Sequence, residues 1–181
     1  LGPRKIKSCK APVIFENRLA GSMVSPMLGA ISGAAIARGV SFLKEKLGQQ
    51  VYAKGVNIED DPFRKRGLSS RPFDDERAPG QRPLLIDDGV LTTWLLNSSA
   101  ARQLGLKSTG HATLGHGGPP GISSTNVTLM PGTKSLEELM KDAGKGLLIT
   151  DKFSPSLNAN TGDWSVGVSG FWFENGERVY P

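Results

Sequence analysis

The chain has 181 residues, a formal net charge of +5 and 38% hydrophobic residues, with 23 glycines and 12 prolines. This length suits a single domain with a substantial core, and the composition excludes a disordered or fibrous chain. Cys9 is the only cysteine, which excludes an intramolecular disulfide and a cysteine-based structural zinc site. A lone thiol is typical of reducing compartments, so we expect a cytoplasmic protein.

The beginning of the chain predicts a strand and no leader peptide. LGPRKIKSCKAPVIFE has no apolar region before a small-residue cleavage site, so it is not a secretory signal. Because it does not begin with Met, we expect a fragment of a longer protein. Val, Ile and Phe within residues 11–16 predict a strand, and Asn17 is suited to cap a following helix.

Residues 19–37 contain no charged side chain and are flanked by Arg18 and Arg38. Large apolar residues recur at helical spacing, with small residues on another side. Pro26, three serines and three glycines make the stretch too weakly apolar for a membrane span, so we expect a buried core or interface helix. Gly29 and Gly33 lie four residues apart, which predicts close helix packing.

The remaining pattern predicts an α+β domain with mostly antiparallel strands. Asp88-Gly89 and Asn175-Gly176 each separate two β-prone runs and favour two-residue hairpin turns. The other expected elements are an amphipathic helix over 40–47 ended by Gly48, a strand over 56–59, an irregular loop to residue 82, a helix over 98–104, a glycine-rich loop over 105–125, a strand over 126–130, a helix opened by Ser135 and a strand over 147–150.

No motif for enzyme chemistry is intact. His111 and His116 lie in a loop rich in Gly and Pro, and a metal site there would need an acid such as Asp151 or Asp163. The alternative, which the loose spacing favours, is a pair of histidines exposed or bonded to the backbone. Basic clusters at residues 4–10 and 64–66 lack interleaved aromatic residues, so they indicate a solvated surface rather than a nucleic-acid site.

Several blocks in order carry a family resemblance: VIFENRLAGSMVSPMLGAISGAAIARGVSFLKEKLGQQV, DDPFRKRGLSSRPFDDE, DDGVLTTWLLNSSAARQLGLKSTGHA, SSTNVTLMPG and TGDWSVGVSGFWFENGERVYP. Together they cover nearly the whole chain, which resembles the carboxy-terminal domain of the TldD/PmbA family, with the PmbA (TldE) branch the closer match. The resemblance implies a cytoplasmic peptidase system of paired TldD-type and PmbA-type subunits, connected with peptide maturation and DNA gyrase modulation. It also implies one domain over 1–181, with the N-terminal domain and the extreme C-terminus outside this sequence.

In TldD-type members a His-Glu-x-x-x-His motif binds zinc on the helix corresponding to residues 19–37. Alignment on the shared Gly-x-Gln-Val at residues 48–51 places its functional positions at Val24, Ser25 and Gly29. None of these side chains can bind zinc or act as a base. Independently of the alignment, residues 17–44 contain no His, Cys, Asp or Glu, so a small shift of register restores no site.

We therefore expect a non-catalytic subunit that holds no metal and pairs with a zinc-carrying TldD-type subunit, with another copy of itself, or with both. His111, Thr125 and Asn126 are the candidate wall of a peptide site, and an unpaired strand edge could hold the peptide backbone. Two alternatives stay open. One is a self-sufficient metallopeptidase using His111, His116 and an acid, and the other is a nucleic-acid or gyrase-associated binding module.

Overall fold

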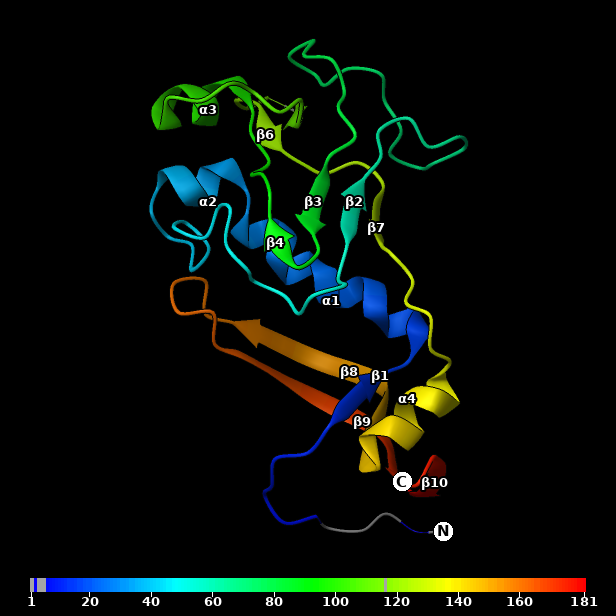
Figure 1. Ribbon diagram of the computed structural model, residues 1–181. Helices are drawn as coiled ribbons and strands as arrows, with labels where there is room; N and C mark the ends of the chain where they lie inside the picture. The colour runs from blue at the N-terminus through cyan, green and yellow to red at the C-terminus, as the bar shows by residue number, and fades with distance from the viewer. Residues whose placement is uncertain (1, 3–5, 116) are drawn as a thin grey trace. The chain divides into compact units, whose positions relative to one another are not determined.

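The computed structural model describes residues 2, 6–115 and 117–181. The chain forms two compact units, coloured by sequence in Figure 1. The first unit comprises Leu1–Met23, Pro131–Leu157 and Asp163–Pro181, and the second comprises Val24–Met130 and Asn158–Gly162. Strands and helices occur in both, and most strand pairs are antiparallel, which confirms the predicted α+β class.

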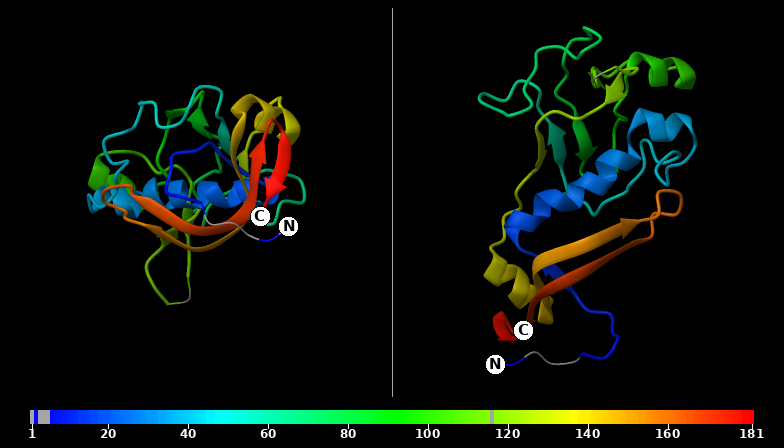
Figure 2. Two further views of the ribbon diagram at one scale, coloured as in Figure 1. Left: turned by 90° about the horizontal axis from the view of Figure 1, so that it is seen from below. Right: turned by 180° about the vertical axis from the view of Figure 1, so that it is seen from behind.

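The sheet of the first unit has the strand order β1-β8-β9-β10. β8 (Lys145–Leu157) and β9 (Trp164–Glu174) run side by side as a long antiparallel ribbon, visible in both views of Figure 2. β1 (Val13–Phe15) pairs with β8 in parallel, and β10 (Glu177–Tyr180) pairs with β9 antiparallel. Asn175 and Gly176 form the β9–β10 turn with φ angles of 50° and 88°, as a type I′ hairpin turn requires.

The strand predicted over residues 147–150 is too short, because β8 continues through Pro155. The pairing with β9 shifts register between Phe153 and Ser156, and Ser154 has a φ of 50°. Such a bulge leaves a residue out of the ladder, which accommodates a proline that lacks a backbone N–H. The interruption that reads as a strand end is thus a bulge within a longer strand.

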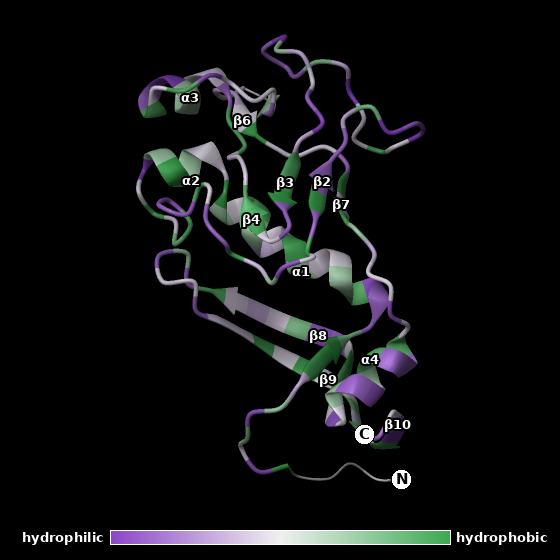
Figure 3. Cartoon of the chain, in the orientation of Figure 1, coloured by the Kyte–Doolittle hydropathy of each residue, from purple (hydrophilic) through white to green (hydrophobic). Residues whose placement is uncertain are grey.

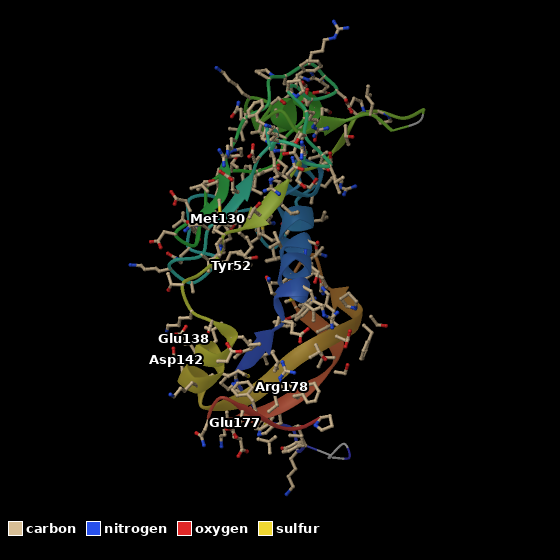
Figure 4. The ribbon with its side chains drawn as sticks, turned by 90° about the vertical axis from the view of Figure 1, so that its right-hand side faces the viewer. Tyr52, Met130, Glu138, Asp142, Glu177 and Arg178 are labelled. Atoms are coloured by element: carbon tan, nitrogen blue, oxygen red, sulfur yellow. The ribbon has the colours of Figure 1, made fainter. Side chains whose placement is uncertain are left out.

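Helix α4 (Leu136–Ala143) packs on this sheet, and Ser135 caps it as predicted. The Ser135 hydroxyl accepts from the backbone N–H of Glu138 at 3.2 Å, and the Glu138 carboxylate accepts from the backbone N–H of Ser135 at 2.7 Å. Figure 4 labels Glu138 and Asp142 on this helix. Met140 is buried on its inner face with Leu148 and Phe173, which forms the core of the first unit.

The second unit contains a sheet with the strand order β4-β3-β2-β7. The strands, all antiparallel, are β2 (Ile58–Asp60), β3 (Leu84–Asp87), β4 (Val90–Leu91) and β7 (Val127–Leu129). Asp88 and Gly89 form the β3–β4 turn with φ angles of 46° and 82°. A separate pair consists of β5 (Ala112–Thr113) and β6 (Gly121–Ile122).

Strands β3 and β4 supply hydrophobic residues to the core of the second unit, as the colouring of Figure 3 shows. The side chains that are fully buried there share an aliphatic character and come from the α1–α2 region and three strands: Ile31, Ile58, Leu85, Ile86 and Leu91. Because aliphatic burial is the main favourable term in folding, this cluster fixes the sheet against the neighbouring helix.

The uncharged stretch forms two helices instead of one. α1 spans Asn17–Ala30, so Asn17 is the first helical residue and not the cap before it, and α2 spans Gly33–Ala37. Between them Ser32 forms a parallel bridge with Leu95, and the N–H of Gly33 donates to the carbonyl oxygen of Leu95 at 2.7 Å. The backbone groups freed by the break are therefore satisfied by a neighbouring extended segment.

The two glycines of the stretch differ in their surroundings. A Cβ on Gly33 would lie 2.6 Å from Leu96 Cδ2 and 2.8 Å from Ala100 Cβ, so α2 meets α3 (Ser98–Leu104) at close range. A Cβ on Gly29 would meet nothing within 4 Å. Within the second unit, Gly33 therefore packs closely against a neighbouring helix. The prediction of close packing at Gly29 is wrong within that unit.

The predicted amphipathic helix over residues 40–47 is wrong, because the structure has successive turns there. The Ser41 hydroxyl donates to the carbonyl oxygen of Ala30 at 2.6 Å and accepts from the N–H of Leu43 at 3.0 Å. The N–H of Phe42 donates to the carbonyl oxygen of Ala159. These hydrogen bonds to the backbone of other segments replace the i to i−4 hydrogen bonds that a helix would form here. Across the described part of the chain, no helix combines the length and apolarity needed to cross a bilayer.

Candidate functional site

A buried polar network at the end of β2 brings together residues that are distant in the sequence. The Asp60 side chain is inaccessible to solvent, and its Oδ2 lies 3.1 Å from Nε2 of His111, which is 2% exposed. Nδ1 of His111 lies 2.8 Å from the hydroxyl of Thr109, which itself accepts from the N–H of Leu96 at 2.7 Å. Both ring nitrogens of His111 are therefore occupied by neighbouring oxygen atoms.

Thr125 completes the shell around Asp60. Its backbone N–H lies 2.9 and 3.0 Å from the two carboxylate oxygens, and its hydroxyl donates to Oδ1. Burial by itself raises the pKa of Asp60, but the hydrogen bonds from His111 and Thr125 outweigh it, and the pKa lies below its ordinary value. Asp60 is therefore a charged carboxylate at neutral pH, held by donors from two other segments.

Asn126 fastens the long loop that follows β2. Its Nδ2 donates to the carbonyl oxygen of Asp61 at 2.7 Å and to the hydroxyl of Ser70 at 2.9 Å, and its Oδ1 accepts from the N–H of Ser69 at 3.2 Å. A Cβ on Gly67 would lie 2.6 Å from this Oδ1. The amide is thus saturated by the loop that it anchors, so its role here is structural.

Two further residues hold the same loop against the β5–β6 region. Asp74 is 1% exposed, and its carboxylate accepts from the N–H groups of Ala78 at 2.8 Å and Ala112 at 2.9 Å. The Arg71 guanidinium donates to the carbonyl oxygens of Ala112 and Ser123, each at 3.1 Å. Irregular backbone is stable here because side chains satisfy its polar groups.

The three residues that the resemblance aligns with the zinc motif lie on α1 in two kinds of surroundings. Val24 is buried in the core, whereas Ser25 and Gly29 are exposed. A methyl-bearing side chain, a hydroxyl and a hydrogen do not supply the imidazoles that hold zinc or the carboxylate that takes the proton from water. The donor set at this helix therefore does not fit a zinc ion.

Elsewhere the described residues offer no alternative metal site. Within residues 2, 6–115 and 117–181, no group of three or more His, Cys, Asp or Glu side chains is placed to hold a metal ion. His111 is engaged by Asp60 and Thr109, and Asp151 forms an ion pair with Arg18 at 3.2 Å. His116, the other imidazole of the metal-site alternative, lies outside the described residues.

Beside this network the second unit has two hollows that share part of their lining. The first, of about 390 Å³, lies at the α1–α2 break and includes Gly29, Leu95, Ser123 and Ser124. The second, of about 280 Å³, lies between α2, α3 and the segment before β6. Ala34, Arg38 and Ile122 line both hollows, so the two lie next to each other, and we call the pair the Arg38 groove.

The structure gathers the three predicted wall residues around β2 and the loop after it, but none of them lines the Arg38 groove. His111 and Asn126 are buried and Thr125 is half-buried. Thr125 and Asn126 follow Ser123 and Ser124, which do line the groove, so the predicted residues lie directly behind its wall. The sequence analysis did not identify Asp60, because the run Asp60-Asp61-Pro62 is typical of a loop. Its only signal is that it ends a short strand, Ile58–Asp60, with a burial pattern in which Ile58 and Asp60 share the buried face.

Comparison with known proteins agrees with the sequence resemblance. Residues 8–181 match the model of the PmbA/TldA metallopeptidase C-terminal domain. The chain is 42% identical over 181 residues to the Escherichia coli protein named Metalloprotease PmbA, covering 100% of this chain and 38% of that protein.

Solved structures show the same fold. A Thermotoga maritima protein described as a modulator of a DNA gyrase has a TM-score of 0.87 and 37% identity, covering 98% of this chain and 41% of its own. TldE from Thermococcus kodakarensis has a TM-score of 0.79 and 26% identity, covering 93% of this chain and 39% of its own. The chain thus spans about two fifths of the length of these relatives. The matched domain, the sequence identity and the shared fold place this chain in the PmbA/TldD family.

Proposed function

We propose that this chain belongs to a non-catalytic subunit of the PmbA (TldE) type, which pairs with a zinc-carrying TldD-type subunit to cleave peptides in the cytoplasm. The observation that carries the proposal is the chemistry of α1, where Val24, Ser25 and Gly29 stand at the positions of the zinc motif. Hydrolysis by zinc needs ligands and a base that these side chains lack. In this arrangement the partner supplies the metal and this subunit shapes the peptide site.

The edge of β6 supports a role in holding peptide. The N–H of Ser123 donates to the carbonyl oxygen of His111 at 3.0 Å, while Ile122 is opposite Ala112 in the register. Hydrogen-bonded and non-hydrogen-bonded pairs alternate along an antiparallel ladder, so the backbone groups of Ile122 point away from β5. Ile122 is one of the residues that line the Arg38 groove, and an extended peptide there could pair with these backbone groups whatever its side chains.

The alternative of a self-sufficient metallopeptidase draws on the name Metalloprotease that relatives carry. It is less well supported, because His111 has no free ring nitrogen to offer a metal. The alternative of a nucleic-acid module rests on the exposed cluster of residues 64–66, in which Arg64 already donates to the carbonyl oxygen of Asn126 and the hydroxyl of Thr128. The experiment described next distinguishes both alternatives from the proposal.

The test uses the full-length protein, its TldD-type partner and their mixture. We expect cleavage of an unstructured peptide only by the partner or the mixture, and zinc by elemental analysis only in fractions that contain the partner. A His116→Ala variant should leave zinc content and cleavage by the mixture unchanged. A partner variant without the glutamate of its zinc motif is the matched control and should abolish cleavage.

Zinc-dependent cleavage by the full-length protein alone, lost in the His116→Ala variant, would replace the proposal with the metallopeptidase alternative. DNA binding at low salt with a steep salt dependence would favour the nucleic-acid alternative. Molar masses measured by light scattering, separately and mixed, decide whether the subunit pairs with its partner, with itself or with both.

A further inference from the structure

Arg38 occupies a distinctive place in the groove. It is the C-cap residue of α2. Its backbone N–H donates to the carbonyl oxygen of Ala34 at 3.4 Å and the N–H of Gly39 donates to that of Ile36 at 2.9 Å, which fixes where the Arg38 side chain begins. The side chain is exposed, and within the described residues it forms no ion pair or hydrogen bond. Its positive charge is therefore free for an external partner.

Among the residues that the structure describes, Arg38 is also the only charged one that lines either hollow. The other lining residues are aliphatic, small or neutral polar, such as Leu28, Leu95, Ser124 and Gln103. A single guanidinium beside apolar walls attracts one anionic group, and its planar fork of donors matches a carboxylate in two-point contact. Neutral walls add no competing charge, so the groove as a whole selects one negative charge.

The placement of Arg38 distinguishes two sources of such a carboxylate. Arg38 belongs to the lining of both hollows, of about 390 Å³ and about 280 Å³. A carboxyl terminus bound at Arg38 would leave one hollow empty, because the chain would stop there. An acidic side chain within a continuing peptide would let the residues on its two sides fill both hollows.

We propose that the Arg38 groove binds an extended peptide with an Asp or Glu side chain at Arg38, so that the subunit prefers acidic sites within unstructured peptides. This inference rests on the proposed peptide-handling function and names the substrate class that the groove selects. Burial of the neighbouring side chains supplies affinity, and the ion pair supplies selectivity. A merely structural cation at the end of α2, favoured by the helix dipole, would produce no selectivity among peptides.

The experiment measures binding of two fluorescent peptides to the full-length protein by polarisation. Both are eight residues long by design, with blocked ends and a neutral background, and they differ only in a central Glu or Gln. At low ionic strength we expect the Glu peptide to bind about two- to fivefold more tightly, as for a solvent-exposed ion pair. Raising the salt concentration should reduce this preference.

Variants then assign the preference to one side chain. Arg38→Gln should bind both peptides equally, and Arg38→Lys should keep part of the preference, because a point charge lacks the two-point geometry. Arg102→Gln is the matched control, since Arg102 is an exposed arginine on α3 that lines neither hollow, and it should keep the full preference. Equal urea midpoints of the three variants and the wild type confirm that the fold is intact.

Several results would overturn the inference: no measurable binding of either peptide, equal binding by the wild type, or an unchanged preference in Arg38→Gln. Tighter binding of a peptide whose only negative charge is a free carboxyl terminus would replace the side-chain carboxylate with a terminal one. The proposed function fails separately. A Glu preference without cleavage by the mixture refutes only the pairing, whereas cleavage without a Glu preference refutes only the role of Arg38.

Discussion

Replacing Asp60 by Asn tests whether the buried carboxylate holds the candidate site together. The wild-type side chain accepts from His111 Nε2 and from both the backbone N–H and the hydroxyl of Thr125. An amide of nearly the same shape keeps only one oxygen and gains an NH₂ group. With His111 in the tautomer that donates from Nε2, at least one buried donor then faces another donor, whichever way the amide turns.

The expected loss follows from these bonds. A buried donor without an acceptor costs about 1–3 kcal/mol, and exchanging charge-assisted bonds for neutral ones removes roughly 1 kcal/mol more. We therefore expect Asp60→Asn to lower the free energy of unfolding by about 3 kcal/mol. With a urea slope of about 2–3 kcal/mol/M, the midpoint falls by about 1–1.5 M.

The assay is urea denaturation of the full-length protein, combined with hydrogen exchange at the amide of Thr125. Asp87→Asn is the matched control, because Asp87 is an exposed carboxylate on β3 of the same sheet. It should move the midpoint by less than about 0.3 M. The Thr125 amide should exchange faster in Asp60→Asn and at the wild-type rate in Asp87→Asn.

The direction of the Asp60 pKa shift determines how the free energy of unfolding changes with pH. The pKa of Asp60 is lowered in the folded protein, since hydrogen bonds from His111 and Thr125 outweigh its burial. Its stabilisation is therefore fully present above the pKa of an unfolded aspartate, about 3.9, and disappears as the pH falls through the folded value. The difference between wild type and Asp60→Asn should be constant above about pH 5 and shrink below about pH 4. A difference from Asp87→Asn below about 0.5 kcal/mol at pH 7 would refute the reasoning.

Four further substitutions test packing and capping, each by the shift in urea midpoint. Gly33→Ala should destabilise by about 2 kcal/mol or more, because its methyl would lie 2.6 Å from Leu96 Cδ2, whereas Gly29→Ala, with nothing within 4 Å, should be neutral or slightly stabilising. Equal effects of the two would refute the close approach. Ser135→Ala should lose about 1 kcal/mol with the capping box, and an unchanged midpoint would contradict it. Phe173→Ala, at a fully buried position, should lose about 3–5 kcal/mol, and a loss below 1 would refute its place in the core.

Local patterns in the sequence predicted those elements whose boundaries depend on nearby residues. The helix over 98–104 is α3 with the predicted bounds, ended by Gly105 with a φ of 67°. Ser135 and Glu138 defined the start of α4 in the same local way. In both helices the capping groups lie within three residues of the groups that they satisfy, so the sequence alone contains the interaction.

Elements that depend on distant partners could not be predicted in this way. The amphipathic pattern at 40–47 indicated a helix, but Ser41 bonds to Ala30 and Phe42 bonds to Ala159, and these contacts are invisible in a local window. The same limit applies to the site. Asp60 and Thr125 are 65 residues apart, and nothing in either local sequence indicates that one accepts from the other.

The proposed non-catalytic role is compatible with the buried network around Asp60. A subunit that performs no hydrolysis still has to present a defined surface if it is to position a peptide, because an ordered site reduces the entropy lost on binding. Here Asp60 holds Thr125 and Arg71 holds the backbone of Ser123, so the groove wall at Ser123 and Ser124 is fixed from both sides by partly buried hydrogen bonds. The charged side chains of Asp60 and Arg71 thus stabilise the groove wall from inside the fold. The exposed side of the groove has a single cation, Arg38. This division suits a peptide-positioning subunit better than a hydrolytic one, in which buried acids and imidazoles would have to remain free to react.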